Sequence, residues 1–292
     1  MRSAGPRPAT GRIIAIAVGI AVAAGVVWFS TLEPSNERVW APEHGVLPAV
    51  RFAGDSVFVR AVRNFAHTGE GEFTPAFEDR AYDLGRLETV WFIVTPFSTT
   101  WRGPAHTFVS FGFADSQFVA VSVEARREPP EHYAVLTGLF KRFELIYVIG
   151  DERDLIGSRA VHGGGYDVYV YPVRASREKI RALFVDMMRR ADALREAPEF
   201  YNTVTNNCTS NVVAHVNRIT PRKVPTGPKT VFPGYADEVA HSLGLIDQAI
   251  PIAEARRRYR VNERARRFAD DPDFSLRIRE VDEAASSSAQ AP

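Results

Sequence analysis

The chain has 292 residues, of which 45% are hydrophobic and 24% are charged. This composition is enough for one large folded domain or two small ones, and it excludes a chain that is disordered over most of its length. The 36 basic and 35 acidic residues leave a net charge of +1, so no electrostatic footprint for nucleic acid exists and we expect no nucleic-acid partner.

The N-terminal segment predicts a membrane anchor. Residues 13–32 carry no charged side chain and are about as long as a helix that crosses a bilayer. Arginines precede this run and glutamates follow it, so we expect residues 1–12 in the cytoplasm and the main domain outside the inner membrane. A cleaved signal peptide is the alternative, although no Ala-x-Ala motif follows the apolar run. Both interpretations export the rest of the chain.

Five segments are predicted to contain β-strands, because they alternate apolar and polar residues or are short apolar runs bounded by turn residues. The first predicts a hairpin with its turn at Gly54 and Asp55, and the third predicts a hairpin with its turn at residues 114–116. In chain order, the segments lie at residues 50–65, 90–94, 104–128, 143–149 and 166–172.

Helices are predicted mainly in the second half of the chain. Residues 177–195 place apolar side chains at helical spacing, a second helix starts at Cys208 and ends before Pro221, and a short one covers residues 235–243. We therefore expect an α+β fold with an antiparallel sheet and packed helices. Residues 251–282 form an arginine-rich helical extension, which either lies on anionic lipid or is a solvated continuation of the domain.

These features divide the chain into six expected parts. They are a cytoplasmic N-terminus (1–12), a transmembrane anchor (13–32), a linker (33–47), a periplasmic domain (48–250), the arginine-rich extension (251–282) and a disordered low-complexity tail (283–292).

Cys208 is the only cysteine, so the chain cannot form an internal disulfide. A metal site is disfavoured, because structural zinc takes four ligands and usually two close cysteines, and we expect no metal and no cofactor. A buried inert thiol is the simplest interpretation. However, Asn206 and Asn207 are good N-cap residues, so the sulfur falls in the first helical turn, where backbone donors and the helix dipole favour a thiolate. We therefore consider Cys208 a candidate nucleophile.

A nucleophilic cysteine needs a base, and His106 is the better candidate. His215 follows Cys208 by seven residues along one helix, which is about 10 Å of rise and too far for a hydrogen bond. It is expected to be a surface or packing histidine. His106 begins a strongly patterned strand, where a rigid sheet could hold its ring against the start of the cysteine helix.

The hairpin at residues 104–128 also predicts an orienting carboxylate. Matching the apolar faces of its two strands requires paired residue numbers to sum to an even value, and a turn at residues 114–116 makes this sum 230. Glu124 then lies across from His106, where a carboxylate could orient the ring and stabilise its protonated form. The alternative is that Glu124 pairs with Arg126 or Arg127.

Two further clusters are expected to have no chemical role. Gly163, Gly164 and Gly165 lack the lysine and the following helix of a phosphate-binding loop, so they predict a flexible turn. The acidic and basic residues at 151–154 are expected to be a solvated, salt-bridged segment after a strand.

Six blocks of the sequence, in this order, resemble the exported domain named after the N-terminal periplasmic part of the lipoprotein N-acyltransferase Lnb. The likeness spans about residues 48–250. The blocks are His106-Thr-Phe-Val-Ser-Phe-Gly-Phe, Ser122-Val-Glu-Ala-Arg-Arg-Glu, Gly138-Leu-Phe-Lys-Arg-Phe-Glu-Leu, Asp151-Glu-Arg-Asp-Leu-Ile, Pro198-Glu-Phe-Tyr-Asn-Thr-Val-Thr-Asn-Asn-Cys-Thr and Pro233-Gly-Tyr-Ala-Asp.

This resemblance implies a membrane-anchored bacterial envelope protein, related to an enzyme that moves a fatty acyl chain to the amine of a lipoprotein. The order of histidine before cysteine is also similar to that of permuted papain-like enzymes. It implies a permuted papain-like fold with Cys208 as nucleophile and His106 as base. The chain departs from the acyltransferase after residue 250, where no further segment is apolar enough to span a membrane.

Three functions are therefore compatible with the sequence. The first is acyl transfer or hydrolysis through a thioester on Cys208, with lipids or lipoproteins as substrates. The second is a cysteine amidase or peptidase acting on envelope peptides, and the third is an envelope scaffold without enzymatic activity. An apolar groove beside Cys208 would favour a lipid substrate, whereas a polar cleft would favour a peptide.

Overall fold

An apolar helix precedes an α+β unit in the computed structural model, which describes residues 8–98, 100–225, 227, 229 and 232–280. The first unit, residues 1–35, contains α1 (Pro8–Thr31). Within the described residues, α1 is the helix whose length and composition suit a membrane crossing, over Gly11–Thr31. This agrees with the predicted anchor.

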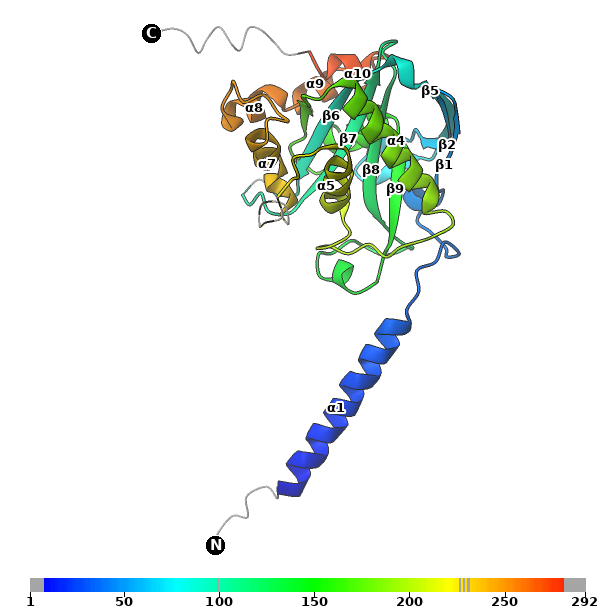
Figure 1. Ribbon diagram of the computed structural model, residues 1–292, viewed down its shortest axis with the longest axis vertical. Helices are drawn as coiled ribbons and strands as arrows, with labels where there is room; N and C mark the ends of the chain where they lie inside the picture. The colour runs from blue at the N-terminus through cyan, green and yellow to red at the C-terminus, as the bar shows by residue number, and fades with distance from the viewer. Residues whose placement is uncertain (1–7, 99, 226, 228, 230–231, 281–292) are drawn as a thin grey trace. The chain divides into compact units, whose positions relative to one another are not determined.

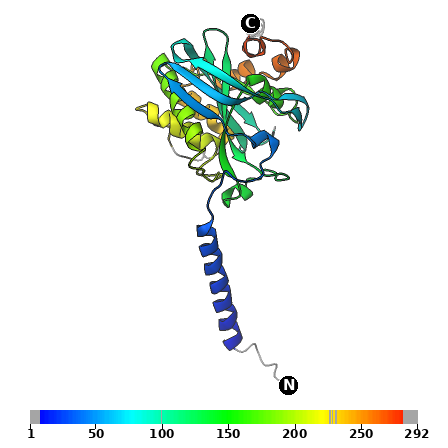
Figure 2. The same ribbon diagram turned by 90° about the vertical axis from the view of Figure 1, so that its right-hand side faces the viewer.

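The second unit, residues 36–292, is built on an eight-stranded sheet, drawn in Figures 1 and 2. The strands follow the order β1-β2-β9-β8-β7-β6-β10, and β5 also pairs with β2, while β3 and β4 form a separate hairpin. Their bounds are β1 Ala49–Ala53, β2 Ser56–Arg63, β3 Ala66–Gly69, β4 Glu72–Thr74, β5 Phe77–Asp83, β6 Leu87–Pro96, β7 Ala105–Phe113, β8 Phe118–Arg126, β9 Glu144–Gly150 and β10 Tyr169–Pro172.

The sheet is mixed rather than antiparallel, because β2 pairs with β9 in parallel through Arg63 and Gly150. The two backbones approach closely here, and a Cβ atom on Gly150 would lie 3.0 Å from the carbonyl oxygen of Arg63. Local alternation identifies strands but says nothing of partners distant in sequence, so the expectation of an antiparallel sheet missed this pairing.

The predicted register of the central hairpin is confirmed. Phe108 pairs with Ser122 and Val109 with Val121, which gives the expected sum of 230. This register places the apolar residues of both strands on one face and leaves His106, Phe108 and Ser122 on the other, because successive side chains of a strand alternate between faces.

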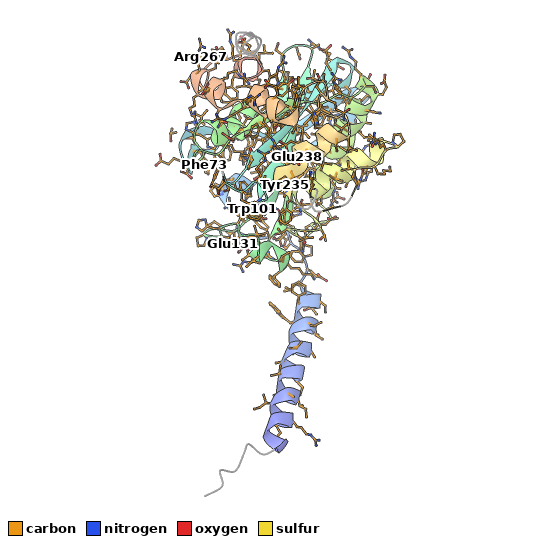
Figure 3. All side chains as sticks on the ribbon, turned by 90° about the vertical axis from the view of Figure 1, so that its left-hand side faces the viewer. Phe73, Trp101, Glu131, Tyr235, Glu238 and Arg267 are labelled. Carbon is orange, nitrogen blue, oxygen red and sulfur yellow. The ribbon has the colours of Figure 1, made fainter. Side chains whose placement is uncertain are left out.

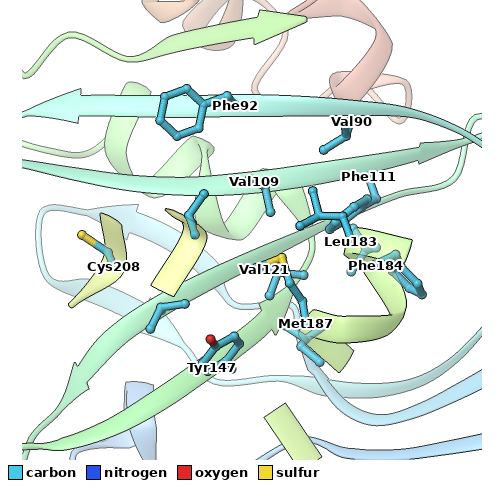
Figure 4. Close-up of a cluster of buried hydrophobic side chains, with 14 of the residues drawn as sticks. Val90, Phe92, Val109, Phe111, Val121, Tyr147, Leu183, Phe184, Met187 and Cys208 are labelled. Carbon is cyan, nitrogen blue, oxygen red and sulfur yellow. The ribbon is translucent and has the colours of Figure 1, made fainter. Parts of the chain in front are cut away.

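Helices cover both faces of the sheet. The face that carries Val109 and Val121 packs against α4 (Arg177–Ala193) and α5 (Cys208–Ile219), as Figures 1 and 4 show, and α7 (Ala236–Ser242) extends this layer. The opposite face, with Phe108 and Ala120, is covered by α2, α3, α9 and α10. Their bounds are α2 Glu152–Leu155, α3 Gly157–Ala160, α9 Asn262–Arg267 and α10 Phe274–Arg277.

The arginine-rich extension forms α8 (Ile252–Tyr259), α9 and α10, and its apolar side chains belong to the core. Ala265, Phe274 and Ile278 are at most 2% exposed. Arg279 also forms a buried ion pair with Glu152, which is fully buried. The described part of the extension is therefore packed onto the domain. The predicted tail at 283–292 lies outside the described residues.

The polar segment at residues 151–154 is ion-paired, as expected, but only half of it is solvated: Arg153 is exposed and Asp151 half-buried, whereas Glu152 and Asp154 are buried. Asp154 is fully buried and binds Arg63 through two hydrogen bonds of 2.8 and 2.9 Å. His67 contacts the same carboxylate at 2.9 Å, and the backbone N–H of Phe65 donates to it at 3.0 Å. Although burial opposes ionisation, His67 and Arg63 hold the pKa of Asp154 below its ordinary value. Sequence alternation does not reveal burial of a charged residue that finds a distant partner.

The Asp154 ion pair predicts a large loss of stability on substitution. Asp154→Leu leaves Arg63 as a buried cation without its partner, so the free energy of unfolding should fall by about 3–5 kcal/mol. Asp115→Leu is the matched control, because its ion pair with Arg86 is largely exposed and should contribute at most about 1 kcal/mol. Urea unfolding of both variants measures the difference, and equal losses would contradict the burial argument.

Candidate active-site cavity

Cys208 is the first residue of α5, as predicted. Asn207 caps this helix: its side chain accepts a hydrogen bond from the N–H of Ser210 at 2.8 Å, and the Ser210 hydroxyl accepts one from the N–H of Asn207 at 2.8 Å. This reciprocal capping box fixes the start of the helix. Cys208 is 5% exposed, and Figure 4 shows it at the first turn of α5.

A buried pair of threonines ties the start of α5 to β7. The Thr107 and Thr209 hydroxyls are 2.9 Å apart, and each residue follows directly after a candidate catalytic residue. Thr209 Oγ1 also lies 3.8 Å from Cys208 Sγ. The relative position of the strand and the helix is thus set within one residue of both His106 and Cys208.

His106 belongs to a hydrogen-bond chain that ends at Glu124. His106 Nε2 lies 2.7 Å from the Ser122 hydroxyl oxygen, and Ser122 donates its proton to Glu124 Oε1 at 2.7 Å. Since that hydroxyl has a single proton, it must accept from His106, which places the ring proton on Nε2. The Nδ1 atom of His106 is therefore the unprotonated nitrogen.

Glu124 lies near His106, as the register predicts, but Ser122 stands between them. The carboxylate is 3.7 Å from the His106 ring nitrogen and makes closer contacts with His44 Nε2 at 3.2 Å and Arg159 Nη2 at 3.0 Å. The alternative pairing of Glu124 with Arg126 or Arg127 is not seen. Although burial opposes ionisation, the hydrogen bond from His44 and the positive charge of Arg159 hold the pKa of Glu124 well below its ordinary value.

The predicted residues meet at one cavity of about 280 Å³. It lies where β7 begins and β8 ends, so residues from both faces of the sheet line it. Cys208 and His106 both face this space, and no hydrogen bond joins the two described side chains. The remaining lining residues are His44, Phe97, Ala105, Val123, Glu124, Ala125, Arg127, Tyr133, Arg159 and Tyr201.

The loop after β6 forms one rim of this cavity and is held by the segment at residues 233–237. Gly234 is required there, because a Cβ atom would lie 1.2 Å from the carbonyl oxygen of Arg102. Asp237 is fully buried and binds Arg102 at 2.9 Å and Arg256 at 2.8 Å. The two segments meet on the side seen in Figure 3, where Trp101 and Tyr235 are labelled.

His215 is a packing residue, in agreement with the sequence analysis. It is 1% exposed, with Nε2 at 2.7 Å from the Tyr147 hydroxyl and Nδ1 at 2.6 Å from Asp186. Both ring nitrogens are therefore occupied. Among the residues that the structure describes, no group of three or more His, Cys, Asp or Glu side chains gathers that could hold a metal ion.

Sequence reasoning missed three residues of this constellation. Ser122 could have been predicted from strand alternation, because it lies on the same face of β8 as Glu124. No sequence pattern indicated His44 or Arg159, because they reach Glu124 from segments 80 and 35 residues away. Only the folded chain brings them to the carboxylate.

The fold and the cavity define an α+β protein with a helix-capped cysteine and a histidine–serine–carboxylate chain around one cavity. The chain belongs to the Lnb N-terminal periplasmic domain family, whose model matches residues 73–233, more than half of the sequence. This match lies inside the span expected from the six blocks. No curated protein and no solved structure matches the chain. The periplasmic family and the apolar helix α1 together fit a membrane-anchored envelope protein.

The surroundings of His106 predict an unusually low pKa. Burial, followed by the nearby Arg159 cation, lowers the pKa of His106 from its ordinary 6.5 to about 4, against the opposing effect of Glu124. Between these two pH values the unfolded chain binds a proton that folded His106 does not. The free energy of unfolding attributable to this group should therefore fall as the pH is lowered from 6.5 to 4.

Arg159→Leu tests the contribution of the Arg159 cation to the low pKa of His106. Removing the cation should raise the pKa of His106 towards 6.5, measured by NMR titration of the imidazole. Arg86→Leu, at an exposed position, serves as the control and should leave this pKa unchanged. An unaltered His106 pKa in Arg159→Leu would contradict the assignment.

Proposed function

We propose that this protein is a membrane-anchored envelope enzyme that transfers or hydrolyses acyl groups through a thioester on Cys208. One observation carries the proposal: Cys208, His106 and Glu124 line a single cavity, and the buried Ser122 joins His106 to Glu124 by hydrogen bonds. We place the anchor in the inner membrane and the domain in the periplasm, and this is supported by the apolar α1 and the periplasmic family. The domain boundaries expected from the sequence are part of this proposal.

In the first half-reaction, Nδ1 of His106 takes the proton of Cys208 and the sulfur attacks an ester carbonyl carbon. The backbone N–H groups of Cys208 and Thr209 have no intrahelical acceptor at the start of α5, so they are suited to stabilise the oxyanion. The tetrahedral intermediate then collapses, the C–O bond breaks and His106 returns the proton to the leaving alkoxide. The product is a thioester on Cys208.

In the second half-reaction, an amine or water attacks the thioester. His106 takes its proton, the C–S bond breaks and the proton returns to sulfur. Glu124 acts through Ser122 to hold the ring and stabilises its protonated form. Substrate must bring the thiol and the ring into contact, and catalytic hydrogen bonds are often long in enzymes without substrate.

The cavity that Cys208 lines also carries the charged side chains of Glu124, Arg127 and Arg159. Support for a lipid-derived acyl group over a peptide comes from a second, apolar cavity, which Thr209 lines and Cys208 does not. It is narrow, with about 120 Å³ of open space between the sheet, α4, α5 and α7. Thr209 lines it, directly after Cys208, and Val212 and Val213 continue the wall along α5. An acyl chain attached to the sulfur could therefore bury its methylene groups here, at about 0.8 kcal/mol each.

Alkylation of the single thiol tests the proposed base. Wild-type Cys208 should react with iodoacetamide at neutral pH at least about tenfold faster than Cys208 in His106→Ala, because the variant lacks the group that removes the proton. Intact mass spectrometry measures the rate without ambiguity, since no other cysteine exists. His132→Ala, at an exposed histidine, is the matched control. Equal and slow labelling of wild type and His106→Ala would remove Cys208 as the nucleophile.

Chain-length preference tests the apolar cavity. Val213→Phe should slow formation of a long-chain thioester on Cys208 but not of an acetyl thioester, because the added ring occupies the space of the chain. The protein is incubated with long-chain and acetyl esters, and the mass that each adds to Cys208 and that hydroxylamine removes is measured. The ratio of long-chain to acetyl thioester is then compared between variants. Val135→Phe, at an exposed valine, is the control. An unchanged ratio would assign the cavity to packing alone, and thioester formation from peptide amides instead of esters would favour an amidase.

A further inference from the structure

Residues 36–45, which lie within the expected linker (33–47), are hydrogen-bonded to the domain. We call residues 36–45 the N-terminal strap. At its start, the Asn36 side chain donates hydrogen bonds to the carbonyl oxygens of Leu194 and Arg195, both at 2.9 Å. In its middle, the N–H of Ala41 donates to the carbonyl oxygen of Arg127 at 2.9 Å. The strap lies outside the part of the chain that the family model matches.

Arg126, at the end of β8, holds both ends of the strap. Its side chain is 2% exposed and donates to Asn36 Oδ1 at 2.8 Å and to the carbonyl oxygens of His44 at 3.0 Å and Gly45 at 3.4 Å. Its guanidinium also lies 4.1 Å from the centre of the Trp40 ring. Because the N–H groups of the buried Arg126 guanidinium donate to both ends of the strap, they fix it in one conformation.

The strap delivers His44 to the cavity. His44 is 2% exposed, and its Nδ1 accepts a hydrogen bond from the backbone N–H of Arg127 at 3.4 Å. A backbone N–H can only donate, so the ring proton is on Nε2. That proton faces Glu124 Oε2 at 3.2 Å. His44 therefore donates to one carboxylate oxygen while Ser122 donates to the other.

Arg159 also donates to Glu124 Oε1 at 3.0 Å, so His44 is the partner of the other oxygen, and the three donors together determine which nitrogen of His106 is free. With Glu124 held by His44, its other oxygen is presented to Ser122, whose proton then points away from His106. Without His44 the carboxylate is held through Oε1 alone, where Arg159 and Ser122 compete for the same oxygen. It can then turn towards Arg159, and the Ser122 hydroxyl can instead donate to His106 Nε2. The ring proton would then move to Nδ1, the nitrogen that has to accept the proton of Cys208.

We propose that His44 is a positioning residue of the Cys208 site, carried by the N-terminal strap, and that its hydrogen bond to Glu124 keeps His106 Nδ1 unprotonated. This inference rests on the proposed thiol chemistry. Because the strap directly follows the first unit in the chain, the segment that connects domain and anchor is also part of the reactive site.

The test compares His44→Leu, which removes the donor, with His44→Gln, whose amide N–H can replace it. Full-length protein in detergent is used for both. His44→Leu should slow alkylation of Cys208 by about tenfold, the effect of losing one hydrogen bond to a charged group. His44→Gln should recover most of the wild-type rate. A purely structural role would not give this rescue.

Nitrogen chemical shifts of the imidazoles provide a second measurement, and its wild-type part needs no variant. In the wild type, both His44 and His106 should carry the proton on Nε2, and His44→Leu should shift His106 towards the Nδ1–H form. Protonation of His44 on Nδ1 in the wild type would overturn the inference even if both variants failed to fold.

The outcomes separate this inference from the proposed function. If His106→Ala slows alkylation and His44→Leu does not, the strap is only structural and the inference is wrong. If neither variant slows alkylation, the proposed function itself is wrong. Slow alkylation in both, with rescue by His44→Gln, supports both.

Discussion

The arrangement of the cavity depends on a largely buried carboxylate that must remain charged. Glu124 is 15% exposed and receives hydrogen bonds or ion pairs from Ser122, His44 and Arg159. Each comes from a different part of the chain, namely the same strand, the N-terminal strap and α3. A charge in such surroundings is stable only when its partners are in place, so the carboxylate couples the geometry of all three.

The sheet sets the second constraint, because alternation assigns His106 and Thr107 to opposite faces. Thr107 binds α5, the helix of Cys208, whereas His106 binds Ser122 on the other face. A thiol and an imidazole from opposite faces can share a space only where the sheet ends. The cavity is found there, at the start of β7, with Ala105 and His106 both in its wall. Thr209, the residue after Cys208, lines the apolar cavity between the sheet and the helices.

Prediction from the sequence succeeded where the information is local. The two hairpins, the register sum of 230 and the helix start at Cys208 all follow from residue spacing and capping within about 25 residues. It failed where charged residues meet distant partners. Asp154 was expected in solvent but is buried against Arg63, and β5 was not predicted because its residues do not show the alternation of a half-buried strand. The contacts of the strap were not predicted, since nothing in its own residues indicates that Arg126 binds it.

The sequence by itself therefore determined an apolar N-terminal helix, an α+β fold, a capped cysteine and a carboxylate opposite a histidine, because each depends on periodicity or on neighbours in the chain. Only the tertiary structure decided that Ser122 stands between His106 and Glu124, that His44 and Arg159 complete the carboxylate's surroundings, and that one strand pairing is parallel. The physical reason is that hydrogen-bond partners and buried charges are selected by distance in space, which a one-dimensional pattern does not contain.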